Sequence, residues 1–120
     1  MANEIKTDLR LIASKGGMEV DRREQKTDIT MTGENLAHFV QAVPTSNTAL
    51  ESVDIAGLGT EGLVFLKNLD STNYISVGLT GSYTIRLNAG ESCLFRSNQG
   101  ALYALANTAT VNLEVLVIED

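Results

Sequence analysis

One glycine-rich hexapeptide has the spacing of a phosphate-binding loop. Residues 57–62 read Gly-Leu-Gly-Thr-Glu-Gly, which matches the G-x-G-x-x-G pattern of dinucleotide-binding proteins. In those proteins the glycines follow a strand and open a helix, whose amino terminus faces the pyrophosphate. Here they follow a loop-like segment and precede the apolar run 63–69, which is typical of a strand. We therefore interpret the hexapeptide as a flexible glycine-rich turn and not as a nucleotide-binding site.

The chain has one histidine, His38, and one cysteine, Cys93. A metal site needs several ligands at matched geometry, and a nucleophilic cysteine needs a base that generates its thiolate. His38 alternates with Leu36 and Val40, which places it on an apolar or interface face of a strand. Cys93 lies in an apolar run and is expected to act as a small buried hydrophobe. Neither residue predicts catalysis or metal binding.

One loop, residues 68–73, is dense in oxygen atoms. It reads Asn-Leu-Asp-Ser-Thr-Asn, and Asp70 is its one carboxylate. Calcium requires several converging carboxylates and carbonyls, and the loop lacks the glycine and the terminal glutamate of an EF-hand. We therefore predict a β-turn in which the Asn and Asp side chains accept hydrogen bonds from the backbone.

The three tyrosines, Tyr74, Tyr83 and Tyr103, suggest an aromatic face for a sugar or a protein partner. Packing in the core or on a sheet surface is the simpler interpretation, because aromatic residues are frequent in strands. With no polar cluster suited to catalysis, we expect a protein that is not an enzyme and that has no cofactor and no metal site.

Composition and charge exclude several classes of function. Nine basic and fifteen acidic residues give a net charge of −6, which argues against nucleic acid as a partner because such proteins need a basic patch. No run approaches the ~18 apolar residues of a membrane helix, and the first residues lack the pattern of a signal peptide. A single cysteine excludes an intrachain disulfide and fits a reducing compartment.

The first half of the chain predicts a few polar strands. Residues 4–14 read as a strand with one buried face, residues 15–17 as a turn, and the chain then returns from Met18. The charged run 21–24 is interpreted as a solvated edge that blunts association, with a specific docking site as the alternative. Residues 36–43 form a further strand that ends at Pro44.

The second half is more apolar and predicts strands in rapid succession. Residues 61–120 hold nine charges against fifteen in residues 1–60, and the run 63–69 reads as a strand covered on both faces. Further strands are predicted over residues 73–79, 83–87, 92–96, 101–106 and 111–118. The sequence therefore predicts an all-β, two-sheet antiparallel sandwich of eight to ten strands. The length predicts one domain, 1–120, in which residues 1–31 form a more polar strand region.

Three segments carry a resemblance to the small structural proteins of tailed-bacteriophage virions. They are residues 62–78 (Gly-Leu-Val-Phe-Leu-Lys-Asn-Leu-Asp-Ser-Thr-Asn-Tyr-Ile-Ser-Val-Gly), residues 85–91 (Ile-Arg-Leu-Asn-Ala-Gly-Glu) and residues 102–107 (Leu-Tyr-Ala-Leu-Ala-Asn). Residues 14–17 and 28–33 resemble this family more loosely. The resemblance implies a jelly-roll-like β-sandwich built into the particle as a capsid decoration (cement) protein, a head fibre, or a neck or tail component.

From this resemblance we expect a capsid decoration protein that binds the lattice of the major capsid protein. It would be a homotrimer located in the virion, which assembles in the host cytoplasm. Residues 1–31 are the expected region of contact between subunits, and the candidate contact residues are Arg10, Arg22, Arg23, His38 and Tyr74. The alternatives are a neck, tail or head-fibre component and a carbohydrate-binding β-sandwich module.

Overall fold

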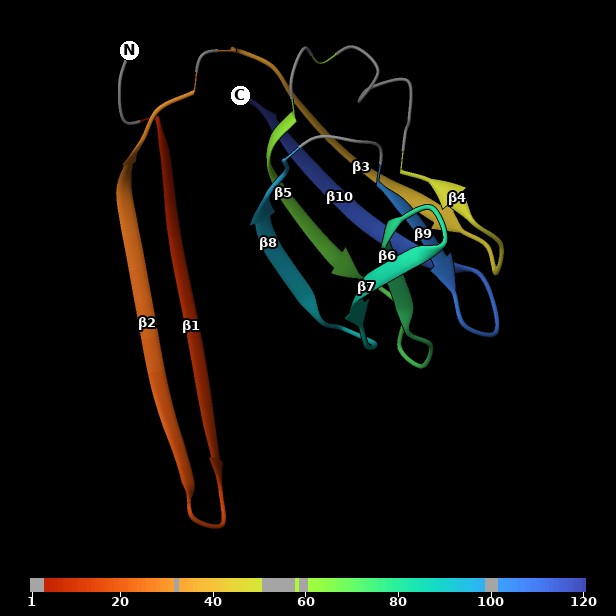
Figure 1. Cartoon of the computed structure of the whole chain (residues 1–120), viewed down its shortest axis with the longest axis horizontal. Coiled ribbons are helices and arrows are strands. Elements are labelled where there is room, and N and C mark those ends of the chain that lie inside the picture. Colours follow the sequence, from red (N-terminus) through yellow and green to blue (C-terminus); the bar gives the residue numbers. More distant parts are fainter. Residues whose placement is uncertain (1–3, 32, 51–57, 59–60, 99–101) are drawn as a thin grey trace. The chain divides into compact units, whose positions relative to one another are not determined.

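The computed structural model describes residues 4–31, 33–50, 58, 61–98 and 102–120. The chain groups into two compact units, Met1–Thr32 and Gly33–Asp120 (Figure 1). The polar strand region predicted over residues 1–31 falls within the first unit. That both units belong to one domain stays a prediction.

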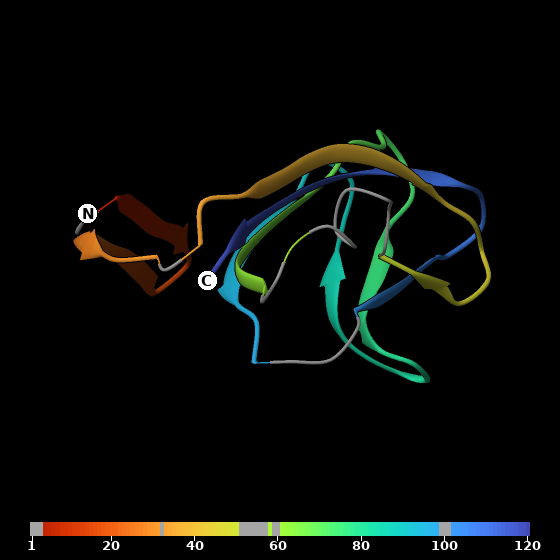
Figure 2. The ribbon, with the colours of Figure 1, turned by 90° about the horizontal axis from the view of Figure 1, so that it is seen from above.

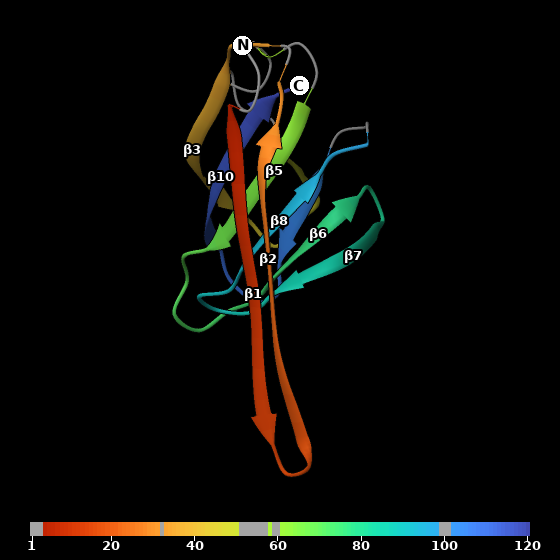
Figure 3. The same cartoon turned by 90° about the vertical axis from the view of Figure 1, so that its left-hand side faces the viewer.

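The first unit is a long β-hairpin. Strand β1, Ile5–Lys15, pairs antiparallel with β2, Met18–Ile29, in an unbroken register from Thr7 to Lys15. Gly16 takes a positive φ of 59° in the turn, a conformation in which a side chain is strained. The two strands pair only with each other among the described residues, so the hairpin is a two-stranded ribbon (Figure 3). The charged run 21–24 therefore lies in the middle of β2.

The second unit is a β-sandwich of two four-stranded sheets, which Figure 2 shows from a second direction. Its strands are β3 (Leu36–Val43), β4 (Thr48–Ala49), β5 (Glu61–Asn68), β6 (Ile75–Leu79), β7 (Ser82–Leu87), β8 (Ser92–Arg96), β9 (Tyr103–Ala106) and β10 (Val111–Glu119). All pairings are antiparallel. The sheet orders are β3-β10-β5-β8 and β4-β9-β6-β7. The first sandwich strand thus pairs with the last, as in a jelly roll.

The predicted fold class is confirmed. The described residues are all-β and form ten antiparallel strands, within the predicted range of eight to ten. No helix occurs in the described part of the chain, and none there is long and apolar enough to cross a membrane. The first sheet and the second sheet supply the two layers of the sandwich.

The core lies between the two sheets and is built from alternate residues of each strand. In β10 the four residues predicted to share a face, Val111, Leu113, Val115 and Val117, are all buried. In β5 the inward residues Val64 and Leu66 are fully buried. The remaining buried hydrophobic residues are Ala37, Val43, Leu50, Ile75, Val77, Leu87, Ala104 and Ala106. Alternation of period two is what a sheet with one face against a core requires.

The run 63–69, predicted to be covered on both faces, alternates between buried and half-buried residues within β5. Leu63 and Phe65 point away from the core on the outer face of the first sheet. The second apolar face of this strand therefore lies at the surface of the sandwich.

The predicted turn at residues 68–73 is confirmed and is centred on the buried Asn68. The Asn68 Oδ1 accepts a hydrogen bond from the Asp70 amide at 2.8 Å, and the Asn68 Nδ2 donates to the carbonyls of Asn73 and Leu87 at 2.9 and 3.0 Å. The amides of Asn73 and Thr72 donate to the Asp70 carboxylate, which lowers the pKa of that group. The side-chain oxygens of Asn68 and Asp70 therefore accept hydrogen bonds from backbone amides of the same loop.

Candidate interaction surfaces

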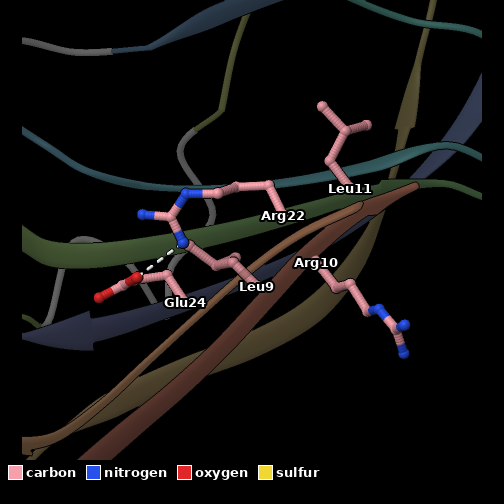
Figure 4. Close-up of a pocket in the computed structure, with 5 residues that line it drawn as sticks. All are labelled: Leu9, Arg10, Leu11, Arg22 and Glu24. Atoms are coloured by element: carbon pink, nitrogen blue, oxygen red, sulfur yellow. Dashed lines mark hydrogen bonds and ion pairs between the residues drawn. The ribbon is translucent and has the colours of Figure 1, made fainter. Parts of the chain in front are cut away.

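One face of the hairpin is apolar and exposed. Residues opposite each other in an antiparallel pair project to the same side, so the register places five apolar residues together. We call this the ribbon face, defined by Leu9, Leu11, Ala13, Met18 and Val20. The same register places the charged residues Lys15, Arg22, Glu24 and Lys26 on this side, around the apolar group. In Figure 4 Leu9 and Leu11 lie on the same side of the ribbon as Arg22 and Glu24, whereas Arg10 points to the other side. The hairpin is therefore amphipathic.

The ribbon face lacks the cover that its sequence pattern predicted. The alternation of Leu9 and Leu11 predicted a strand with one buried face, but Leu9 is 49% and Leu11 64% exposed. Met18 and Val20 are exposed as well. A single two-stranded hairpin is at best marginally stable in water without a third strand or a packing partner. The ribbon face is therefore a candidate surface for contact with another chain.

The opposite face of the hairpin carries two ion pairs that join β1 to β2. The Arg10 guanidinium donates to both carboxylate oxygens of Asp21 at 3.1 and 2.9 Å. The Arg23 guanidinium donates to both oxygens of Asp8 at 2.9 and 2.6 Å. Such two-point pairs fix geometry as well as charge, although at an exposed position each contributes little to stability. Four charged side chains of this face, Asp8, Arg10, Asp21 and Arg23, are thus paired within the hairpin.

We expect acid to loosen the hairpin. Hydrogen bonding from Arg23 lowers the pKa of Asp8 below its ordinary value, and Gln25 and Arg10 act in the same direction. A lowered pKa in the folded state stabilises the hairpin above the ordinary carboxyl pKa of about 4, and this contribution is lost as pH falls below it. An NMR pH titration of the β1 and β2 amides should show it. In Asp8→Asn the acid-dependent change should be smaller, and an unchanged titration would contradict the role of Asp8.

The outer face of the first sheet forms a second apolar surface. The registers place His38, Leu116, Phe65 and Leu94 in one row across β3, β10, β5 and β8. We call this the sheet face, and it also includes Leu36, Val40, Leu63 and Ile118. Leu36 and Val40 are 63% and 58% exposed on the edge strand β3. The His38 Nε2 lies 2.8 Å from the Glu114 carboxylate on this surface, and the registers also place Lys67 and Arg96 on it.

The five predicted contact residues are divided between the two units of the chain. Arg10 and Arg23 lie on the ion-paired side of the hairpin, whereas Arg22 lies on the side of the ribbon face and pairs with Glu24 at 2.7 Å. His38 lies on the sheet face of the other unit. Tyr74 precedes β6 in the second sheet. The charges thus mark the hairpin correctly as a surface element, but its apolar residues were not among the predicted contacts.

The missed residues had a signal in the sequence. Leu9 and Leu11 alternate with polar residues, and Met18 and Val20 continue the pattern across the turn. Such a pattern predicts one apolar face but not whether that face packs within the chain. The same ambiguity applies to Leu63 and Phe65.

The residues considered for catalysis show no assembled site. Cys93 packs against the core, and burial raises the pKa of its thiol, which disfavours the reactive thiolate. Within the described ranges, no group of three or more His, Cys, Asp and Glu side chains could hold a metal ion. Of the glycine hexapeptide, residues 57, 59 and 60 lie outside the described residues, and Gly62 lies within β5.

The three tyrosines make contacts within the chain. The Arg86 guanidinium lies 3.7 Å from the centre of the Tyr74 ring, in a cation–π contact that covers one face of the ring. The Tyr83 hydroxyl donates to the Asn47 side chain, and Tyr103 is half-buried in β9. This arrangement argues for structural packing of the tyrosines.

No family model matches the chain. Comparison with the curated proteins and with the solved structures also found no significant match.

Proposed function

We propose that this protein is a non-enzymatic structural component of a bacteriophage virion, of the capsid decoration type. It would bind the lattice of the major capsid protein as a homotrimer and stabilise the head. The observation that carries the proposal is that one small chain combines a well-packed sandwich with two apolar surfaces, the ribbon face and the sheet face. Surfaces of this kind suit a protein whose work is to hold other chains together.

The fold is consistent with this role by analogy. Jelly rolls occur in viral capsid proteins, but also in lectins and cupins, so the fold alone does not assign a function. Cupin chemistry is not supported by the described residues, which lack a metal-ligand cluster. At Tyr74, Arg86 already covers one face of the ring, which leaves less of it for a sugar to stack on. The sequence resemblance to small virion proteins therefore gives the most specific hypothesis.

Within this proposal, the sheet face contacts the capsid lattice. Val40 projects from the edge strand β3 next to Leu36 and His38 and is exposed. From His38, the row of outward side chains continues across the sheet through Leu116 and Phe65. A broad row of half-buried apolar side chains with an exposed margin gives a partner protein a surface to bury, and the chain's charge of −6 makes a neutral or basic partner surface the better match.

The test compares particles assembled with and without this protein. We expect particles that lack it to lose integrity at lower temperature and under osmotic shock, and electron microscopy should place the protein on the capsid surface. Unchanged particle stability together with a bare shell would reject the decoration role. Density in a ring at the neck or tail would instead favour the alternative of a neck, tail or fibre component.

A matched pair of substitutions tests the sheet face. We expect Val40→Lys to reduce the amount of protein bound per particle severalfold, because a charge would enter the proposed apolar contact. Thr84→Lys is the control, since Thr84 is exposed on β7 of the opposite sheet. Quantitative gel analysis of purified particles measures both. Equal binding of the two variants would show that the sheet face is not the lattice contact.

A further inference from the structure

We propose that the ribbon faces of three copies of this chain pack against one another, so that three hairpins form one bundle with their apolar sides inward. This inference deepens the proposed function and rests on it for the homotrimer. It assigns the contact between subunits to Leu9, Leu11, Ala13, Met18 and Val20, which were not among the charged candidates of the sequence.

The first argument is the one-sided character of the hairpin. On one side, Arg10 and Arg23 pair within the hairpin with Asp21 and Asp8. On the other side, the five apolar residues of the ribbon face lie beside Lys15, Lys26 and the Arg22–Glu24 ion pair. The exposed apolar side chains are therefore concentrated on the ribbon face, with Ile12 on the opposite side.

The second argument is the distribution of charge. The hairpin, residues 4–31, carries six basic residues (Lys6, Arg10, Lys15, Arg22, Arg23 and Lys26) and six acidic residues (Glu4, Asp8, Glu19, Asp21, Glu24 and Asp28), so its net charge is zero. Residues 33–120 carry three basic and nine acidic residues, a net charge of −6. Copies of the sandwich repel one another, whereas copies of the hairpin do not. The neutral element is therefore the one suited to self-association.

The third argument concerns faces and edges. The strands of the ribbon also have free edges, through which hairpins of different copies could pair. Charged side chains on an edge strand oppose such pairing, and the middle of β2 reads Asp-Arg-Arg-Glu-Gln-Lys over residues 21–26. Arg22, Glu24 and Lys26 of this run project to the side of the ribbon face. Nearer the turn, that face carries apolar side chains from both strands and is the more favourable contact.

The test uses two neighbouring substitutions in the full-length chain. Leu11 and Ile12 are exposed to nearly the same extent, 64% and 60%, but project to opposite sides of β1. We expect Leu11→Glu to convert the trimer to a monomer, a threefold fall in mass by light scattering or sedimentation. Ile12→Glu should leave the mass unchanged. Circular dichroism should show that the sandwich stays folded in both variants, because both positions lie in the hairpin unit and neither is buried.

A cross-linking measurement provides an independent readout. In a Cys93→Ser background, Leu11→Cys should be joined between chains by a short bismaleimide, because the bundle places the three Leu11 positions close together. Ile12→Cys should remain largely uncrosslinked. These variants keep the apolar character of the strand and do not depend on introducing a charge.

Several outcomes would overturn the proposal. A wild-type protein that is a monomer or a dimer in solution would do so, as would a trimer that survives Leu11→Glu or is lost equally in Ile12→Glu. These results are separable from the proposed function, because binding to particles is measured on the capsid and not on the free protein. A trimeric protein absent from particles would reject the virion role and leave the bundle standing.

Discussion

Replacing Leu66 with alanine is expected to lower the free energy of unfolding of the sandwich by about 3 kcal/mol. Leu66 is fully buried at the centre of β5, between the two sheets. The substitution removes apolar contacts and leaves a cavity that the rigid sheet cannot fill. Urea denaturation followed by circular dichroism should show a lower midpoint with little change in slope.

The matched control for Leu66→Ala is Leu63→Ala. Both leucines lie on β5, but Leu63 is on the outer side of the strand and only half-buried. We expect this substitution to cost about 1 kcal/mol or less, since part of the side chain already contacts water. If both substitutions destabilise the sandwich equally, then the outer side of β5 is covered in the isolated chain and the sheet face is not a free surface.

Replacing Asn68 with alanine is expected to have a comparable effect, about 3 kcal/mol, for a different reason. The side chain of Asn68 bonds the Asp70 amide and the carbonyls of Asn73 and Leu87. Its backbone also bonds the Glu91 carbonyl and the Gly90 amide, so one residue joins the turns 68–73 and 88–91. Alanine leaves buried polar groups without partners, and the same urea measurement should detect the loss.

Asn88→Ala is the control for Asn68→Ala. The Asn88 side chain accepts one exposed hydrogen bond, from Arg86 at 2.9 Å. Loss of an exposed hydrogen bond should change stability by no more than about 0.5 kcal/mol, because water replaces it. Equal costs for the two asparagines would show that burial of Asn68 is not what makes its hydrogen bonds important.

The core residues could be predicted from the sequence, because the alternation of apolar and polar residues involves only near neighbours in the chain. Val111, Leu113, Val115 and Val117 alternate with polar residues, and period-two alternation has one structural solution in a strand against a core. Turns were readable for the same reason, since Asn68 and Asp70 hydrogen-bond to nearby backbone groups. The order of strands within each sheet was not readable, because pairing such as β3 with β10 joins residues far apart in the chain.

The candidate surfaces were readable only in part. The charged run 21–24 correctly indicated exposure. Arg10 and Arg23 pair with Asp21 and Asp8 within the hairpin, and their contact with another chain stays a prediction. The apolar alternation at Leu9 and Leu11 predicted a buried face, which the single chain does not provide. An alternating pattern predicts that one face of a strand is apolar. It does not predict whether the same chain or another chain covers that face.

The sequence by itself determined an all-β chain of eight to ten strands, with inward residues named on β10 and with Asn68 and Asp70 in a turn. It did so because alternation and turn chemistry act over a few neighbouring residues. Only the tertiary structure separated the hairpin from the sandwich and gave the jelly-roll order of the sheets. It also distinguished the apolar faces enclosed in the core from the two left at the surface. Those properties depend on which distant strands pair, and pairing is decided by the burial available to the whole chain.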